Sequence, residues 1–581
     1  MRRNDDEMEP GGGAATVVAP SPEVVAEVLA TVTAPGAEAP AHHDDVAMTH
    51  RQILTVFSGL MLGMFLAALD QSVVATALPT IAGDFHGLNR LTWVVTAYLL
   101  TSTASAPLYG KISDLYGRKK IFQFAIVLFL AASALAGLSQ NMNELIVFRG
   151  LQGLGAGGLM VLAMSIVGDI VPPAQRGRYQ GYFGAVFGVA SVAGPLIGGF
   201  LVQSISWRWI FYINLPLGAA ALVVTTFVLK DRGERRRHKI DYLGALLLVC
   251  GVCSLLLVTT LGGSASGYGY PWGSWQILTM IAAGVTLIAA FVVREMKAPE
   301  PIVPMNLFRK RVFTASNAAG FIIGVAMFGA IIYLPVYLQV VKGVSPTISG
   351  LELLPLMVGL LGASIWSGQV ITRRGRYKIF PIVGTAVTTV AMGLLALLSP
   401  TTSYLVISAF LLLLGIGMGL VMQVLVLAVQ NGVDYKDLGT ATSLSNFFRS
   451  LGGAFGTAIL GAVLTDRLDG NLFAALPGPA RPHIKQISQL IVGSPKDLKL
   501  LPAPIHAAAV QAYVHSIDTV FIVATPIVAL AFICALLLPE IKLRATVRTR
   551  SHGGPGDPQA DGNGAGESAH ELAGAAEALM I

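Results

Sequence analysis

The chain has 581 residues, of which 54% are hydrophobic and only 12% are charged, and its formal net charge is +7. The charged share is about half of that in an average soluble protein, which excludes a soluble globular protein and indicates one that crosses a membrane. The basic residues gather in loops between apolar runs and form no single basic face, which argues against a nucleic-acid-binding protein.

The first fifty residues are polar and rich in proline, glycine and alanine, and they lack a short apolar core behind a basic start. We expect no cleavable signal peptide there and predict a disordered tail over residues 1–50, with a second over 546–581. Between the tails, apolar runs recur that can cross about 30 Å of hydrocarbon as helices. The predicted spans are 52–78, 91–109, 121–139, 143–168, 179–203, 209–229, 241–261, 275–293, 313–341, 347–371, 380–398, 403–430, 440–465 and 517–538.

Lysine and arginine are distributed unevenly among the loops between these spans. If the N-terminus lies in the cytoplasm, 27 of the 39 basic residues fall on the cytoplasmic side close to the membrane and eight fall outside. An excess of basic residues marks the cytoplasmic loops of membrane proteins. We therefore expect a multi-pass protein of the plasma membrane with both termini in the cytoplasm.

Two segments far apart in the chain repeat each other. "GKISDLYGRKKIF" (110–122) and "GQVITRRGRYKIF" (368–380) share six residues at a constant offset of 258. Such parallel repeats flank a midplane binding site in transporters. The repeat predicts two six-helix bundles, 51–230 and 312–545, with two helices inserted over 231–311. Within the second bundle, residues 466–516 are predicted to form a long extracytoplasmic loop with room for a helix of its own.

Five segments, in order along the chain, resemble signatures of the major facilitator superfamily, and two of them resemble its fourteen-span drug:proton antiporter branch (EmrB/QacA type). The resemblance covers about residues 50–545. The segments are "LDQSVVATALP" (69–79), the loop 110–120, "RGLQGLGAGG" (149–158), "GVASVAGPLIGG" (188–199) and "WRWIFYINLP" (207–216).

The resemblance implies an all-α membrane protein of fourteen transmembrane helices, built as two six-helix bundles with two extra helices between them. It also implies an antiporter that lies in membrane lipid, acts as a monomer and exchanges protons for lipophilic small molecules, cations among them. One alternative is a dedicated exporter of one endogenous metabolite, lipid or siderophore; another is a membrane scaffold that has lost transport.

Several kinds of chemistry lack the residues they need. The sequence contains no GxxxxGK[ST] segment to hold the phosphates of ATP, and its histidines are scattered without metal-ligand spacing. Cys250 and Cys253 form a CxxC inside an apolar run, where cysteine acts as a small packing residue. We therefore expect no cofactor, no metal and no enzymatic activity.

The first span carries an acid in its apolar stretch. Asp70 lies 18 residues into that span, about 27 Å along a helix, and a charge in hydrocarbon costs at least about 2.5 kcal/mol. Arg149, on the fourth span, lies at a comparable depth, with Gln152 on the same face. Burial favours a protonated acid and a nearby arginine favours an ionised one, which predicts a proton-coupling site. The alternative is a permanent ion pair that only stabilises the bundle.

Glu352 is a further acid inside a predicted span, near the outer end of the tenth. It is either a further coupling carboxylate that binds cations or a solvated residue in an outer vestibule. Arg449, in the middle of the thirteenth span, also needs a partner, and we favour a structural role for it.

The loop after the second span is predicted to act as a gate. In the family that the chain resembles, the residue matching Asp114 faces the N-terminal end of a helix from the other half, here one that begins near Leu438. A helix dipole favours such a placement of a carboxylate. The second copy has Thr372 instead, so the latch is asymmetric; a purely topogenic role for the basic residues is the alternative. The gating residues are Gly110, Asp114, Gly117, Arg118, Lys119 and Lys120.

One face of the fifth span has almost no side chains, which allows close helix contact. We expect it to slide against a similar face of the tenth span, formed by Glu352, Pro355, Gly359, Gly362 and Trp366, although packing with no role in transport is the alternative. The antiporter-motif residues of the fifth span are Gly184, Gly188, Gly194, Pro195, Gly198 and Gly199.

A substrate cavity needs apolar, aromatic and a few polar side chains. The sequence does not select among the residues that could line it. The candidates are Met64, Phe65, Tyr98, Tyr333, Tyr337, Gln339 and Gln423.

Overall fold

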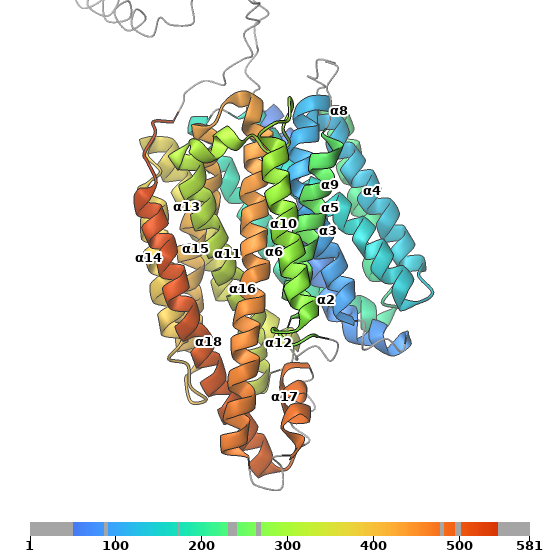
Figure 1. Cartoon of the computed structure of the whole chain (residues 1–581), viewed down its shortest axis with the longest axis vertical. Helices are drawn as coiled ribbons and strands as arrows, with labels where there is room; N and C mark the ends of the chain where they lie inside the picture. Colours follow the sequence, from blue (N-terminus) through green and yellow to red (C-terminus); the bar gives the residue numbers. More distant parts are fainter. Residues whose placement is uncertain are drawn as a thin grey trace, which may run out of the picture. The chain divides into compact units, whose positions relative to one another are not determined.

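Long helices run side by side along the molecule in the computed structural model (Figure 1). The structure describes residues 50–85, 91–171, 173–229, 241–262, 269–344, 346–476, 482–493 and 501–543, so the predicted tails lie outside the described residues apart from His50. The helices are α2 (His50–Asp84), α3 (Leu91–Tyr116), α4 (Arg118–Leu138), α5 (Met142–Ile170), α6 (Pro173–Ser204), α7 (Trp209–Tyr212), α8 (Asn214–Val228), α9 (Tyr242–Leu261), α10 (Trp275–Glu295), η3 (Met305–Arg309), α11 (Arg311–Val341), α12 (Pro346–Leu351), α13 (Leu354–Arg374), α14 (Ile379–Leu395), α15 (Tyr404–Gly432), η4 (Tyr435–Asp437), α16 (Leu438–Ala475), α17 (Ile484–Gly493) and α18 (Ala503–Leu537).

Every predicted span coincides with helix in the structure, because long apolar runs satisfy their backbone within one helix. Within the described residues, eleven helical stretches are long and apolar enough to cross a membrane. The all-helical fold is therefore confirmed. The total of fourteen spans and the domain boundaries remain predictions, because the chain from His50 onward forms one compact unit.

The tenth predicted span is interrupted. α12 ends at Leu351 and α13 begins at Leu354, so Glu352 lies in the turn between them. The prediction that Glu352 lies inside a continuous helix is therefore wrong. Pro355, in the first turn of α13, has no backbone N–H to continue the helical ladder, which explains the break. The sixth predicted span is similarly divided into α7 and α8.

The predicted loop 466–516 is largely helical. α16 continues beyond residue 465, α18 begins well before residue 517, and α17 comes between them in the chain and lies beside the far end of α16 (Figure 1). Leu472, Ile487, Ile491 and Ala512 belong to one buried apolar cluster, so this outer hairpin is held by packing. The predicted helix is confirmed, and its neighbours are longer than expected.

The inserted helices α9 and α10 pack against each other, and α9 also contacts α3 and α16. The repeat is visible in the backbone as well. Gly117 and Gly375, which lie 258 residues apart, both follow the second helix of their repeat with positive φ angles of 93° and 68°. Glycine adopts such angles readily, which explains why the repeat retains it at both turns.

Candidate functional site

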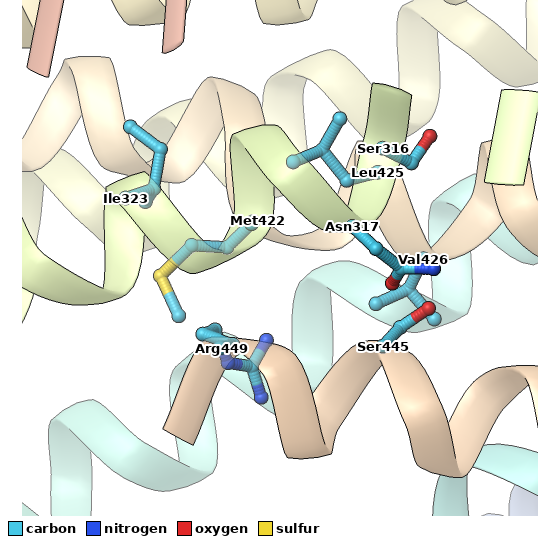
Figure 2. Close-up of a pocket in the computed structure, with 9 residues that line it drawn as sticks. Ser316, Asn317, Ile323, Met422, Leu425, Val426, Ser445 and Arg449 are labelled. Carbon is cyan, nitrogen blue, oxygen red and sulfur yellow. The ribbon is translucent and has the colours of Figure 1, made fainter. Parts of the chain in front are cut away.

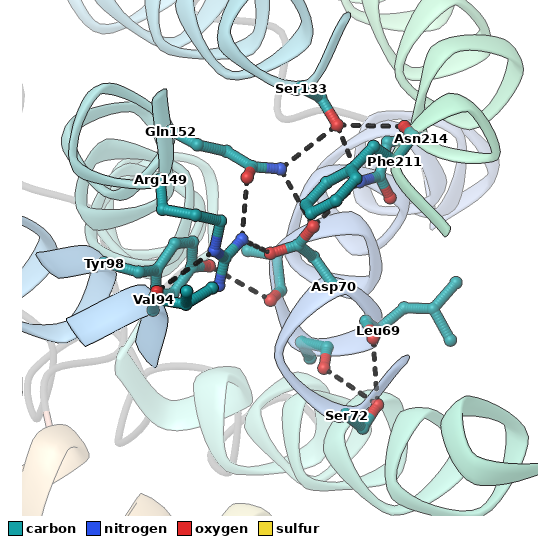
Figure 3. Close-up of polar contacts among 12 residues, drawn as sticks. Leu69, Asp70, Ser72, Val94, Tyr98, Ser133, Arg149, Gln152, Phe211 and Asn214 are labelled. Atoms are coloured by element: carbon teal, nitrogen blue, oxygen red, sulfur yellow. Dashed lines mark hydrogen bonds and ion pairs between the residues drawn. The ribbon is translucent and has the colours of Figure 1, made fainter. Parts of the chain in front are cut away.

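Asp70 lies on α2 in a buried polar cluster (Figure 3). Its Oδ2 pairs with Nη1 of Arg149, on α5, at 2.5 Å. Its Oδ1 accepts hydrogen bonds from Gln152 Nε2 at 2.8 Å and from Asn214 Nδ2, at the start of α8, at 2.9 Å. The predicted proximity of Asp70, Arg149 and Gln152 is confirmed. Both carboxylate oxygens have donors, so this arrangement suits the ionised acid.

Arg149 is also held from other directions. Its Nη1 donates to Gln152 Oε1 at 2.7 Å, its Nε donates to the carbonyl oxygen of Val94 at 3.4 Å, and its guanidinium lies 4.2 Å from the ring centre of Tyr98. The arginine is 1% exposed, so removing its counter-ion leaves a charge that water cannot reach.

Two members of this cluster were not predicted. Asn214 and Ser133 complete it, because Ser133 Oγ accepts from Asn214 Nδ2 at 3.0 Å and from Gln152 Nε2 at 3.1 Å. Asn214 lies in the segment 207–216 and is an amide within an apolar run, which was the available signal. A single sequence does not say which buried polar groups meet.

Asp114 joins the end of α3 to the start of α16. The backbone N–H of Thr440 donates to Asp114 Oδ2 at 3.0 Å, and α16 begins at Leu438, as predicted. Arg118 pairs with Asp114 at 2.9 Å and also with Asp169, at the end of α5. The contact therefore links helices from both predicted bundles, and its gating role stays a prediction.

α3 and α16 approach closely at this end. A Cβ added to Gly110 would lie 2.1 Å from Ser443 Oγ, so only glycine fits there without a shift of the helices. Burial raises the pKa of Asp437, directly before α16, although Lys436 and Lys111 oppose the shift. The start of α16 is thus tightly packed.

The other gating candidates lie around the α3–α4 turn. Gly117 forms the turn, Lys119 Nζ donates to the carbonyl oxygen of Thr226 on α8 at 2.7 Å, and Lys120 is exposed. Thr372, the counterpart of Asp114, donates its hydroxyl to a carbonyl of its own helix. The latch contact made by Asp114 is therefore not repeated by Thr372.

α6 packs along α13, as expected from its glycines. A Cβ on Gly184 would lie 3.4 Å from Leu360 Cδ2, and one on Gly188 would lie 3.0 Å from Leu361 Cδ1. The predicted facing stripe on the tenth span is wrong, because Gly359 faces the backbone of α15 and nothing lies within 4 Å of a Cβ on Gly362. Leucines of α13 therefore fill the space beside the glycines.

The second half of the α6 motif faces other neighbours. A Cβ on Gly194 would lie 2.0 Å from Ser72 Oγ on α2, whereas Gly199 has nothing within 4 Å. Gly198 is buried, and Pro195 directly follows Gly194 on the same helix. Close packing thus explains Gly194 and leaves Gly199 unexplained.

The predicted cavity residues of the first half take part in packing. Met64 is fully buried, and Phe65 packs against the apolar cluster around α2. Tyr98 is buried and donates its hydroxyl to the carbonyl oxygen of Ala67 at 3.2 Å. Of these three residues Tyr98 contacts the Asp70 cluster, through Arg149, and none of them lines the pocket described below.

The cavity residues of the second half are also mostly engaged. Tyr333 and Tyr337 lie in the apolar cluster that also holds the outer hairpin, and they donate to backbone carbonyl oxygens at 2.9 Å. Gln339 donates to Ser349 Oγ at 3.0 Å. Gln423 is buried, and its Oε1 has no hydrogen-bond partner among the described residues.

A pocket lies between α11, α15 and α16 (Figure 2). Its free space is of the order of one water molecule, and Asp70 is not part of its lining. Arg449 is bonded to Asn446 Oδ1 at 2.5 Å. The lining residues are Ser316, Asn317, Gly320, Ile323, Met422, Leu425, Val426, Ser445 and Arg449.

The family model of the Major Facilitator Superfamily matches residues 60–457. The chain belongs to this superfamily. Multidrug transporter protein MdtP of Bacillus subtilis (strain 168) is 41% identical over 512 residues, which cover 84% of this chain and 93% of the relative. Multidrug resistance protein 3 of the same organism is 34% identical and covers 86% and 98%, respectively.

Solved structures show the same major facilitator fold. The proton:xylose symporter XylE superposes with a TM-score of 0.56 over 85% of this chain and 97% of the symporter, at 13% sequence identity. With its many apolar helices, this member of the superfamily is a multi-pass membrane transporter of small molecules.

Proposed function

We propose that this chain is a proton-coupled efflux transporter that exports lipophilic small molecules, drugs or antibiotics among them, and that Asp70 carries the proton. Export is supported by the relatives at 34–41% identity, which are named as a multidrug transporter and a multidrug resistance protein. The observation that carries proton coupling is the buried Asp70, paired with Arg149 inside a bundle that crosses the membrane. Intramembrane acids of this kind are costly and mark proton relays.

Protonation of Asp70 changes what its neighbours can do. A neutral carboxyl no longer balances Arg149, whose guanidinium does not lose its proton in proteins. The pair therefore opens or exchanges partners when a proton arrives, and it re-forms when the proton leaves. One proton moving through 100 mV supplies about 2.3 kcal/mol, enough for a roughly forty-fold gradient.

α5 carries such a change from the first half toward the second. Arg149 and Gln152 lie on this helix, and three turns further on Met164 accepts hydrogen bonds from Gln430 at its carbonyl oxygen, at 3.4 Å, and from Asn446 at its sulfur, at 3.2 Å. A shift of α5 therefore reaches α15 and α16. In this proposal the Asp114 contact is the latch that opens when the halves rock.

The proposal places both termini and the α3–α4 loop in the cytoplasm, and it has the chain act as a monomer in the plasma membrane, without ATP or an enzymatic step. It keeps the predicted bundles 51–230 and 312–545, joined by 231–311. Glu352, in the turn before α13, is a vestibule residue in this scheme.

The test is proton movement in inverted membrane vesicles that contain a pH-sensitive dye. Addition of lipophilic compounds should release protons in vesicles with wild-type protein, and Asp70→Asn should abolish this release. Release with a single compound would instead favour the dedicated exporter. Proton-coupled export that survives in Asp70→Asn would refute the role of this acid.

A further inference from the structure

Arg449 lies in the first half of α16 and has no counter-ion among the described residues. None of the ion pairs among the described residues includes it, and its bonded partner is the neutral amide of Asn446. Arg149, the other intramembrane arginine, has Asp70. Because a guanidinium stays charged, Arg449 carries a positive charge that no ion pair among the described residues balances.

The pocket between α11, α15 and α16, which Arg449 lines, contains further polar groups without partners among the described residues. Within the described part of the chain, neither Nδ2 nor Oδ1 of Asn317 has a hydrogen-bond partner, and neither does Ser316 Oγ. Asn317 is 5% exposed and Ser316 is 2% exposed. Figure 2 shows Asn317, Ser445 and Arg449 around the space between α11 and α16. Buried polar groups are normally paired, so this set is incomplete without a ligand or water.

We propose that Arg449, with Asn317 and Ser316, forms a subsite for the anionic group, such as a carboxylate, of an otherwise lipophilic substrate. This inference rests on the proposed function and narrows its substrate class. A guanidinium and an amide are the donors that suit an anion, whereas a cationic group meets repulsion from Arg449. Met422, Ile323 and Leu425 line the same pocket and suit the apolar remainder of the substrate.

The size of the pocket fits the end of a ligand and not a whole molecule. Its free space in this conformation is of the order of one water, so a larger substrate requires α11 and α16 to move apart. Asn446 connects Arg449 with Met164 on α5, the helix of the Asp70 partners. Occupation of the subsite is therefore connected with the proton site through two hydrogen bonds and one helix.

The experiment compares two dyes that differ in one group. Rhodamine 110 carries a free carboxylate, and rhodamine 123 is its methyl ester. Initial rates of uptake of each dye into energised inverted vesicles are measured, and the readout is the ratio of the carboxylate rate to the ester rate. We expect the wild-type ratio to exceed one. Arg449→Gln should lower it by about tenfold, the typical effect of losing a charge-assisted hydrogen bond.

Matched variants separate this role from a structural one. Arg449→Lys should retain part of the preference, and Asn317→Asp should reverse it because the new acid repels the carboxylate. Arg467→Gln removes the same charge from an exposed position of the same helix and should leave the ratio unchanged. Equal loss of both rates in Arg449→Gln, with the ratio kept, would show that Arg449 only stabilises the fold.

A wild-type preference for the ester overturns the subsite while leaving the proposed function intact. Uptake of neither dye contradicts the proposed function, and the subsite falls with it. Asp70→Asn tests transport and binding separately, since it should stop uptake of both dyes without changing which one binds. Binding is followed by the fluorescence anisotropy of each dye with the purified full-length protein.

Discussion

Replacing Asp70 by asparagine should do more than stop transport. The substitution keeps an oxygen that can accept from Arg149, but it removes the only carboxylate paired with that arginine among the described residues. Because Arg149 is 1% exposed, its charge is left without compensation. Breaking a buried ion pair in this way costs about 3–5 kcal/mol of stability.

The second substitution tests the reasoning. Arg149→Gln alone should cost less, since Asp70 keeps its donors Gln152 and Asn214 and can take up a proton. In the double variant no unpaired charge remains, so the two losses should not add. We expect a coupling free energy toward the upper end of the usual 0.5–3 kcal/mol for residues in contact.

The assay follows thermal unfolding of the purified protein in detergent, together with proton release in vesicles. Asp70→Asn should lower the unfolding temperature and abolish release; the double variant should recover stability and stay inactive. Asp84→Asn, on the same helix, retains an oxygen for the hydrogen bond from Trp207 and serves as the control. If Asp70→Asn is as stable as wild type, the buried pair is not as described, and if the double variant still couples protons, Asp70 is not the carrier.

Three further predictions concern packing and the latch. Gly194→Ala should destabilise the α2–α6 contact because its Cβ would lie 2.0 Å from Ser72 Oγ. Gly199→Ala, whose Cβ has no atom within 4 Å, should be neutral or stabilise the helix by up to about 1 kcal/mol. Thermal unfolding of the two variants distinguishes these outcomes. Asp114→Ala should weaken the latch by about 1 kcal/mol, measured as faster alkylation of a cysteine placed at Ser443. Gly375→Ala should cost about 1–2 kcal/mol because φ is 68°, and equal stability would contradict the turn.

Apolar runs carried most of the information about the fold. The centres of the spans were predictable, because a membrane helix must be long and apolar. The ends were not: α16 and α18 continue into a segment that is too polar and proline-rich for a span, and its helices are held by contacts with each other. The break after Leu351 had a local signal in Pro355, which the apolar run concealed.

The candidate site was predictable where depth and charge decide it. Asp70 and Arg149 are single charges at similar depths of neighbouring spans, so their pairing followed from the cost of leaving either alone. Asn214 is neutral and tolerates several partners, which a single sequence does not rank. Gly359 shows a further limit, because spacing indicates which residues share a helix face but not which neighbour that face meets.

α16 is one continuous helix of 38 residues, about 57 Å long, without an internal proline. Its first turn contacts Asp114, its first half also carries Arg449, and its far end packs into the outer hairpin with α17 and α18. A rotation that frees the first turn must displace the hairpin as well. A binding protein raised against this hairpin should therefore restrain the movement of α16 from the end of the molecule opposite the Asp114 contact.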